Sequence, residues 1–303
     1  MAISFQGKVA IVTGAGGGLG RAHALHLARL GAKVVVNDLG GSLDGSGGNS
    51  QACEKVVAEI IAAGGEAIAN GASVSDDAGV AHLVGQTMDK WGRIDVLIAN
   101  AGILRDKSFA KMELKDFEAV MNVHLLGTVK PCKAVWDIMK AQAYGRIVVT
   151  TSSTGLYGNF GQTNYGAAKL SLVGFMNSLK LEGAKDNIKV NAVCPVAATR
   201  MTAALMPPAV LEMLKPEFVS PAVAYLASDS APTGVILTAA AGVFAAAQLV
   251  ETDGVNLGHN ATADDIAAHF SQISDWGSAK HYEQGGEQSA KFLARTQEKP
   301  VLD

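Results

Sequence analysis

The chain has 303 residues, of which 49% are hydrophobic and 17% are charged, and its formal net charge at pH 7 is −3. This composition favours a compact globular protein with a large core over a disordered chain. Because no dense block of Lys and Arg occurs, the sequence indicates neither a nucleic acid nor a membrane surface as a partner.

Short β-branched runs alternate with longer helical patterns along the first 258 residues. The expected strands are Lys8–Val12, Lys33–Asn37, Glu66–Ala69, Asp95–Asn100, Arg146–Thr151, Ile188–Val193 and Val235–Ala240. The expected helices are Leu19–Leu30, Ser50–Ala63, Asp76–Trp91, Leu114–Ala141, Thr163–Ala184 and Pro221–Ala227. Several strands are apolar throughout, as in parallel sheets that helices cover on both faces. The pattern therefore predicts an α/β fold with a doubly wound parallel sheet of the Rossmann type.

Two segments fall outside this alternation. Residues Leu39–Ser50 are rich in glycine and serine, which predicts a flexible loop after the second strand. Residues 259–303 are polar and helical in places, and we expect them to be a C-terminal extension of a single domain formed by residues 1–258. The extension could cover an active site, join a subunit interface or lie on the surface.

Targeting signals are not expected in this sequence. The apolar run after Lys8 is too short for a secretory signal, and residues 235–250 are fewer than the about 20 that a membrane helix needs. The last three residues are not a peroxisomal signal. Cys53, Cys132 and Cys194 stand far apart without a CxxC pair, so we expect no disulfide and no metal site. This cysteine usage suits a reducing compartment, and a cytoplasmic protein is expected.

The segment Thr13–Gly20, TGAGGGLG, follows the first strand and opens the first helix. A bound pyrophosphate must approach the backbone closely, and a helix N-terminus offers it free N–H groups and positive potential. Side chains at Gly14, Gly18 or Gly20 would obstruct this approach or the packing of the helix on the strand. Glycine-rich turns also occur without a ligand, but the strand–turn–helix context favours a dinucleotide site.

Asp38 ends the second strand, 18 residues after Gly20. A carboxylate at this position accepts hydrogen bonds from the adenosine ribose hydroxyls and repels a 2′-phosphate. No Arg or Lys stands among the glycines or directly after Asp38, so NAD is predicted over NADP. An aspartate at a strand end is also a common turn residue, but its position here favours cofactor discrimination.

Tyr165 and Lys169 are four residues apart in an expected helix and therefore share one face. An ammonium beside a phenol can lower the pKa of the phenol from about 10 towards neutral, which makes it a usable general acid or base. Ser152 ends the fifth strand, where its hydroxyl could bond a substrate oxygen or simply cap a turn. Together with the glycine turn, these residues predict a dehydrogenase that moves a hydride between a nicotinamide and a secondary alcohol or ketone, with Tyr165 as the acid or base.

The glycine turn, Asn100-Ala101-Gly102, Ser152 and Tyr165-x-x-x-Lys169 together resemble the short-chain dehydrogenase/reductase family, over residues 5 to about 258. The resemblance implies a Rossmann-like sheet of about seven strands, a homodimer or homotetramer, and a role for Lys169 in holding the nicotinamide ribose. The cofactor contacts that it implies are Gly14, Gly18, Leu19, Gly20, Asp38, Ser73, Val74, Asn100, Ala101, Gly102, Tyr165, Lys169, Pro195 and Ala198.

The stretches VVVNDLGG, NAGILRDKSF and GLYGNFGQTNYGAAK resemble more closely the (3R)-hydroxyacyl-CoA dehydrogenase domains of peroxisomal multifunctional enzymes type 2, also called 17β-hydroxysteroid dehydrogenase type 4. This resemblance implies NAD-dependent oxidation of a 3-hydroxyacyl-CoA, with a long-chain or steroid-derived acyl group, to the 3-ketoacyl-CoA. Two other functions stay open: a 17β-hydroxysteroid dehydrogenase acting on free steroids, and a non-catalytic NAD-binding regulatory protein.

Two positions depart from the family pattern. His124 stands where most members carry the fourth catalytic residue, an asparagine that holds a water of the proton relay. A histidine there could hold the water, pass a proton itself or pack in the helix without a catalytic role. Val196 follows Pro195 where the family has Pro-Gly, so the backbone beside the nicotinamide can differ.

Residues 196–216 are apolar and rich in methionine, as in a lid over a flat or long hydrophobic ligand. An ordinary helical hairpin packed on the core would have the same composition. Arg105, Lys107 and Arg200 are candidates for contacts with the phosphates of coenzyme A, or else solvated surface cations.

Overall fold

The computed structural model of the chain describes residues 2–42, 44–45, 51–198 and 207–302. Its contacts divide the chain into two compact units, Met1–Ala246 and Ala247–Asp303. This division falls within the last strand of the sheet rather than after residue 258. The assignment of residues 1–258 to one functional domain and 259–303 to an extension stays a prediction.

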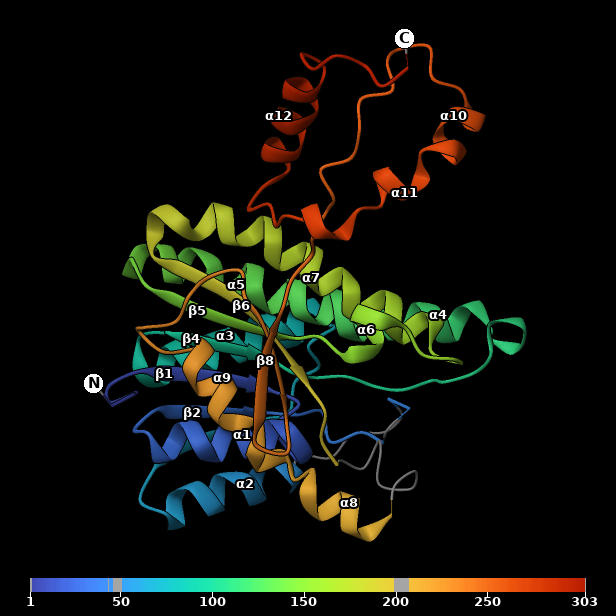
Figure 1. Cartoon of the computed structure of the whole chain (residues 1–303). Coiled ribbons are helices and arrows are strands. Elements are labelled where there is room, and N and C mark those ends of the chain that lie inside the picture. The colour runs from blue at the N-terminus through green and yellow to red at the C-terminus, as the bar shows by residue number, and fades with distance from the viewer. Residues whose placement is uncertain (1, 43, 46–50, 199–206, 303) are drawn as a thin grey trace. The chain divides into compact units, whose positions relative to one another are not determined.

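Eight strands form one sheet in the order β3-β2-β1-β4-β5-β6-β7-β8 (Figure 1). The strands are β1 (Val9–Thr13), β2 (Lys33–Asn37), β3 (Glu66–Asn70), β4 (Val96–Ala99), β5 (Gly145–Thr150), β6 (Ile188–Pro195), β7 (Ile236–Ala240) and β8 (Val243–Ala247). The first seven are parallel, which confirms the predicted doubly wound sheet. Thr13 pairs with Asn37 and Asn37 pairs with Asn70, so β1, β2 and β3 end level. The loops that follow these strands therefore start at the same edge of the sheet.

Helices cover both faces of this sheet, as the apolar strands require. In the first unit they are α1 (Gly18–Arg29), α2 (Gln51–Ala62), α3 (Asp77–Trp91), α4 (Leu114–Met121), α5 (Gly127–Gln142), α6 (Ser153–Tyr157), α7 (Thr163–Gly183), α8 (Pro208–Met213) and α9 (Ser220–Leu226). Helix α1 packs against α2 and α9, and α5 packs against α3, on the opposite face (Figure 1). Helices α6 and α8 are additional to those predicted from the sequence.

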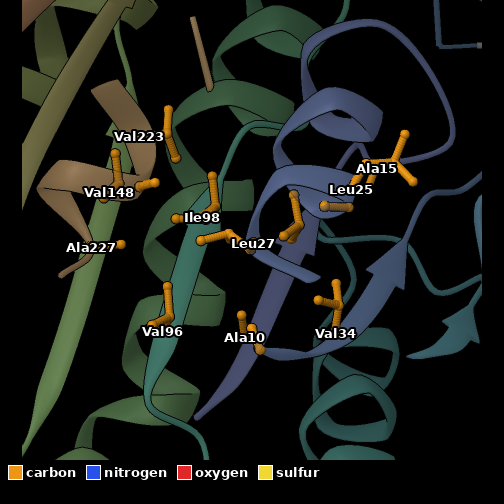
Figure 2. Close-up of a cluster of buried hydrophobic side chains, with 14 of the residues drawn as sticks. Ala10, Ala15, Leu25, Leu27, Val34, Val96, Ile98, Val148, Val223 and Ala227 are labelled. Atoms are coloured by element: carbon orange, nitrogen blue, oxygen red, sulfur yellow. The ribbon is translucent and has the colours of Figure 1, made fainter. Parts of the chain in front are cut away.

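A cluster of buried hydrophobic side chains joins α1 and α9 to the sheet (Figure 2). Leu27 of α1 and Val223 of α9 belong to this cluster together with Ala10, Val34 and Ile98, which come from β1, β2 and β4. All five are at most 1% exposed. Because burying a Val, Leu or Ile side chain contributes about 1.5–3 kcal/mol, this cluster holds the glycine turn of α1 firmly against the sheet.

The sheet contains one strand beyond the seven expected from the sequence. Residues 235–250, which the sequence presents as one apolar stretch, contain two strands joined by a two-residue turn. Ala241 (φ 50°) and Gly242 (φ 79°) both adopt left-handed conformations, as in the turns that close β-hairpins. Alanine rarely adopts this conformation, so the turn gives little signal in the sequence. Within the described ranges, no helix is long and apolar enough to cross a membrane.

The single helix predicted over Leu114–Ala141 is interrupted. A π-helical turn, Asn122–Leu126, separates α4 from α5. Such a turn inserts one extra residue into the helical repeat and is frequent at functional sites, but it leaves the hydrophobic pattern almost unchanged. The turn carries His124, which is buried.

The C-terminal unit contains the helices α10 (Ala263–Ala268), α11 (Phe270–Ile273) and α12 (Gly285–Arg295). None of these three helices contains a buried residue. Ion pairs join its segments instead: Lys280 lies 2.9 Å from Asp253, and Lys291 pairs with Glu251. Thr262 begins α10 with a capping box. Polar contacts therefore account for much of the order within this unit.

His23 makes the folding of the first unit sensitive to acid. Its side chain lies between α1 and α9, with Nδ1 2.9 Å from Ser220 Oγ. Burial lowers the pKa of His23 to about 3, whereas an unfolded chain binds this proton near pH 6.5. The stability that depends on neutral His23 is therefore present above about pH 6.5 and is lost as the pH falls towards 3.

We expect a shift from pH 7 to pH 5 to lower the free energy of unfolding by about 2 kcal/mol through His23 alone. The double variant His23→Leu/Ser220→Ala, which leaves no hydroxyl unpaired, should lose this part of the pH dependence. Urea unfolding of both proteins at the two pH values measures the difference. An equal pH dependence in the variant would contradict the prediction.

Candidate active site

The glycine turn between β1 and α1 leaves no room for side chains at Gly14 and Gly20. Gly14 has a φ of 64°, and a Cβ atom there would lie 2.7 Å from Ala101 Cα. A Cβ at Gly20 would collide with the Gly14 carbonyl oxygen. Asn100 Nδ2 donates to the carbonyl oxygens of Thr13 (3.0 Å) and Gly14 (3.2 Å), so the segment after β4 braces the turn.

The predicted site residues gather at the carboxyl edge of the sheet. Gly18 (φ 51°), Leu19 and Gly20 form the first turn of α1. Those that follow the other strands are Asp38 after β2, Ser73 and Val74 after β3, Asn100, Ala101 and Gly102 after β4, Ser152 after β5, and Pro195 and Ala198 at and after the end of β6. Ligands of open α/β sheets bind outside this edge, and the structure brings these residues together there.

Asp38 lies directly beside the glycine turn. Its Oδ2 accepts a hydrogen bond from Gly16 N at 2.9 Å, and its Oδ1 accepts one from Gly40 N at 2.7 Å. The carboxylate is thus held against the backbone that would receive a dinucleotide. The sequence analysis identifies Asp38 but neither amide donor, because a backbone donor gives no signal in residue type.

A second polar layer supports this region and was not predicted. Asn37 Nδ2 donates to Asn70 Oδ1 at 2.8 Å and to Ala72 O at 2.9 Å, and both asparagines are at most 2% exposed. They fix the start of the loop that carries Ser73 and Val74. Two asparagines at the ends of consecutive strands are the signal that could have identified this pair.

The buried side chains of Ser152, Lys169 and His124 gather around the partly buried Tyr165. Ser152 caps the N-terminus of α6, where its Oγ accepts from Thr154 N at 3.2 Å, and its side chain is near enough to Tyr165 to lower the pKa of that hydroxyl. Lys169, one turn further along α7, has its Nζ 5.6 Å from the centre of the Tyr165 ring. The His124 ring meets the Tyr165 ring edge-on, with centroids 5.2 Å apart.

Burial dominates the protonation of this cluster. It lowers the pKa of Lys169 to about 7, while Lys169 Nζ donates to Thr150 O at 2.6 Å. Burial also raises the pKa of Tyr165, and the hydrogen bond from Ser152 acts in the opposite direction. The sequence analysis expects Lys169 to lower the pKa of Tyr165 towards neutral. The two side chains share a helix face as predicted, but burial raises the pKa of Tyr165 instead, and Lys169 is not among the groups that shift it.

His124 faces the backbone of Ile103, the residue after Asn100-Ala101-Gly102. Its Nε2 lies 2.8 Å from Ile103 O and 3.1 Å from Ile103 N, so in either tautomer this nitrogen can satisfy only one of the two groups. Burial, and then Lys169, lower the pKa of His124 to about 3. The imidazole is therefore neutral near pH 7. Its Nδ1 has no hydrogen-bond partner in the described part of the chain.

Arg105 and Lys107, which the sequence suggests as contacts for the phosphates of coenzyme A, are already paired with an acidic side chain. Arg105 lies 3.0 Å and Lys107 3.4 Å from the same carboxylate, that of Asp116. Lys107 N also donates to Gly161 O, which ties the segment after β4 to the loop before α7. Arg200 and the centre of the predicted lid, residues 199–206, lie outside the described residues. The described end of the lid forms α8.

The chain is similar to proteins of a known family. The family model described as short chain dehydrogenase matches residues 8–208. A putative short-chain type dehydrogenase/reductase of Mycobacterium tuberculosis is 49% identical over 276 residues, 91% of this chain and 96% of that protein. Peroxisomal multifunctional enzyme A of Dictyostelium discoideum is 45% identical over 302 residues, 99% of this chain and 68% of that protein.

The solved structure of full-length peroxisomal multifunctional enzyme type 2 from Drosophila melanogaster is similar to this chain with a TM-score of 0.81 and 36% identity. The match covers 96% of this chain and 50% of that chain, so this chain spans about half of that enzyme. The chain therefore belongs to the short-chain dehydrogenase/reductase family, whose members are oxidoreductases that use a nicotinamide cofactor.

Proposed function

We propose that the protein oxidises a 3-hydroxyacyl-CoA to the 3-ketoacyl-CoA with NAD. The observation that carries this proposal is the extent of the similarity to the multifunctional enzymes. The similarity to the Dictyostelium enzyme extends over 99% of this chain, whereas the general family model matches only residues 8–208. The C-terminal unit, which lies beyond that match, is therefore shared with enzymes whose dehydrogenase domains the sequence resembles.

The proposed chemistry assigns one role to each polar group of the cluster. Bound NAD supplies the hydride acceptor. The Tyr165 hydroxyl, in its ionised form, accepts the proton of the substrate alcohol, and Ser152 donates a hydrogen bond to the same oxygen. Lys169, as a cation below about pH 7, stabilises the ionised tyrosine by its charge, and the proton that Tyr165 accepts passes to solvent after the ketone leaves.

The residues present fit a nicotinamide dinucleotide. Because Gly14 and Gly20 have no side chains, a pyrophosphate can approach the backbone of the turn closely. Helix α1 begins within the same turn and offers its N-terminal N–H groups to that pyrophosphate. Two buried polar atoms beside Lys169, Thr150 Oγ1 and His124 Nδ1, have no hydrogen-bond partner within the described residues. Such atoms usually serve a ligand or an ordered water. Asp38 supports NAD rather than NADP.

The test follows formation of the reduced nicotinamide with NAD or NADP and four substrates: a (3R)-hydroxyacyl-CoA, its (3S) isomer, a steroidal acyl-CoA and a free 17β-hydroxysteroid. Turnover of an acyl-CoA with NAD supports the proposal. Turnover of the free steroid alone would transfer the same catalytic residues to a hydroxysteroid dehydrogenase. If NAD binds but no alcohol is oxidised, a non-catalytic NAD-binding protein becomes the better assignment.

His124 gives a prediction about the position of the family asparagine. An asparagine amide offers both a donor and an acceptor, so it can bond Ile103 O and Ile103 N at once, which one imidazole nitrogen cannot do. We expect His124→Asn to keep kcat within about fivefold and to raise stability by about 1 kcal/mol. His124→Ala should lower both. Steady-state kinetics and urea unfolding measure the two effects, and a loss of activity in His124→Asn would assign the histidine a role that an amide cannot fill.

The proposed homodimer or homotetramer has a candidate surface on α7. Ala167, Leu170, Gly174, Ser178 and Leu181 recur every three or four residues along this helix and are exposed. A stripe of small and apolar residues allows two helices to approach closely. The side chain of Leu170 is 44% exposed and that of Leu181 is 48% exposed. Large apolar side chains exposed at regular helical spacing indicate a surface that another subunit covers.

We expect light scattering to detect a dimer or tetramer at micromolar concentration and a monomer for the variant Leu170→Glu/Leu181→Glu. Placing two carboxylates in the contact should weaken association more than a hundredfold. Ile61→Glu, which places the same charge on an exposed position of α2, is the matched control and should leave the assembly intact. A monomeric parent protein would contradict this prediction.

The proposed compartment is the cytoplasm. All three cysteines are buried and free, which suits a reducing environment. Fractionation of cells that express the tagged full chain tests this, and recovery in an organelle would overturn it.

A further inference from the structure

Every polar group of Asp38 is engaged by a different part of the chain. Its N–H donates to Asn70 O of β3 at 3.0 Å, and its carbonyl oxygen accepts from the Cys53 thiol of α2 at 3.3 Å. The carboxylate oxygens accept from Gly40 N and Gly16 N, at 2.7 and 2.9 Å. Both the backbone and the side chain of Asp38 are thus fixed before any ligand is considered.

Gly16 contributes space as well as a donor. A Cβ atom at this position would lie 2.9 Å from Asp38 Oδ2 and 2.9 Å from Ala52 Cβ, the second residue of α2. Both distances are shorter than side chains tolerate, so one of the neighbours would have to move. At Gly17, the next residue, a Cβ would meet no atom within 4 Å. A side chain would therefore collide with Asp38 at Gly16 but not at Gly17.

The fixed carboxylate has a consequence for cofactor selection. An aspartate at the end of β2 can in principle rotate away from a 2′-phosphate, which reduces the discrimination that its charge provides. Here the rotation would break two hydrogen bonds from backbone N–H groups to a charged acceptor, and such bonds are stronger than neutral ones. Discrimination therefore depends on the groups that hold Asp38 in addition to Asp38 itself.

We propose that Gly16 is a positioning residue for cofactor specificity: its N–H and its missing side chain hold the Asp38 carboxylate against the glycine turn, where it excludes dinucleotides with a 2′-phosphate. The inference rests on the proposed use of NAD. Cys53 acts on the other side of Asp38. Its side chain is fully buried and its thiol is a donor to the Asp38 carbonyl, and burial raises the pKa of this thiol to about 11, so it keeps its proton.

The test measures binding of NADH and NADPH by the fluorescence of the bound reduced nicotinamide, with the full chain and no substrate. The background variant Ala52→Gly removes the second steric neighbour, so that Gly16→Ala then meets Asp38 alone. In this background we expect Gly16→Ala to lower the ratio of the NADPH to the NADH dissociation constant about tenfold. Gly17→Ala is the matched control. Because both dinucleotides share the pyrophosphate, any effect of Gly17→Ala on that group cancels in the ratio.

A double-mutant cycle with Asp38→Ala separates positioning from a general disturbance of the turn. If Gly16 acts through Asp38, Gly16→Ala changes the ratio by less than about twofold once Asp38 is absent. A tenfold fall in both backgrounds, or no change in either, would overturn the inference. A parent protein that prefers NADPH would overturn the proposed use of NAD and this inference with it, whereas a parent that prefers NADH and ignores Gly16 would overturn only the inference.

Cys53 provides an independent variant if Gly16→Ala does not fold. Cys53→Ser keeps a donor for the Asp38 carbonyl, and Cys53→Ala removes it. We expect the ratio to stay unchanged in Cys53→Ser and to fall about threefold in Cys53→Ala. An equal ratio in both variants would show that Asp38 does not depend on this contact and would count against the proposal.

Discussion

Tyr165→Phe is expected to lower kcat about a thousandfold while leaving the dissociation constant of NAD within about twofold of the parent value. The variant removes one oxygen, the atom that exchanges a proton with the substrate in the proposed chemistry. The ring keeps its edge-on contact with His124, and the helix that presents it is unchanged. Most of the contacts expected for the dinucleotide, at the glycine turn and at Asp38, do not involve this hydroxyl.

Tyr157→Phe is the matched control, because Tyr157 is 76% exposed on α6 and is outside the buried cluster. It should keep full activity with the same acyl-CoA. Initial rates of NADH formation and NAD binding, measured on both variants, provide the two readouts. If Tyr165→Phe retained more than a tenth of the parent activity, another group would have to be the base.

Lys169→Met is expected to abolish most turnover and, at the same time, to stabilise the protein at pH 7. The ammonium of Lys169 is 3% exposed, and burial lowers its pKa to about 7 from an unfolded value near 10.4. Below about pH 7 the folded protein therefore carries the full free-energy cost of a buried charge, and this cost declines as the pH rises towards 10. The difference between the two pKa values corresponds to about 5 kcal/mol, from which the lost hydrogen bond to Thr150 O must be subtracted.

We expect Lys169→Met to raise the free energy of unfolding by about 2 kcal/mol at pH 7 and by less than about 0.5 kcal/mol at pH 10, and to lower kcat at least a hundredfold. Urea unfolding at the two pH values and steady-state kinetics measure these effects. Lys115→Met, at a position that is 72% exposed, should change neither. A stabilisation of the same size at pH 7 and pH 10 would show that the gain comes from packing rather than from the buried charge.

A gain in stability together with a loss of activity would indicate that this lysine is retained for function. Among the described residues, the only hydrogen bond of its ammonium is to the carbonyl of Thr150, and no carboxylate compensates its charge among the residues that affect its pKa. Active sites often contain such destabilising groups, because a shifted pKa near neutrality is what proton transfer requires.

Residue patterns along the chain predicted the architecture of the first unit and the place of the site within it. Apolar runs such as Lys33–Asn37 are buried on both faces of the sheet, and their spacing left room only for helical crossovers. All seven predicted strands are present, with ends that shift by at most two residues. Because site residues of parallel sheets follow the strands, Asp38, Asn100 and Ser152 could be placed at one edge before any coordinates were considered.

Local geometry also fixed the pairing of Tyr165 with Lys169, because residues four apart on a helix share a face. Two local features escaped the sequence analysis. They are the π-helical turn around His124 and the hairpin turn at Ala241-Gly242. Each is a local change of backbone conformation at residues whose types give little indication of it.

Other properties of the site arise between segments far apart in the chain and depend on the whole fold. Gly16 and Gly40 hold Asp38 through backbone N–H groups, which every residue but proline has and which therefore leave no trace in a sequence. The low pKa of Lys169 and His124 comes from the amount of protein packed around them, not from their neighbours in the chain. Residue types and spacing determine which groups can meet, but burial and hydrogen-bond geometry, which depend on the whole fold, determine what those groups do once they meet.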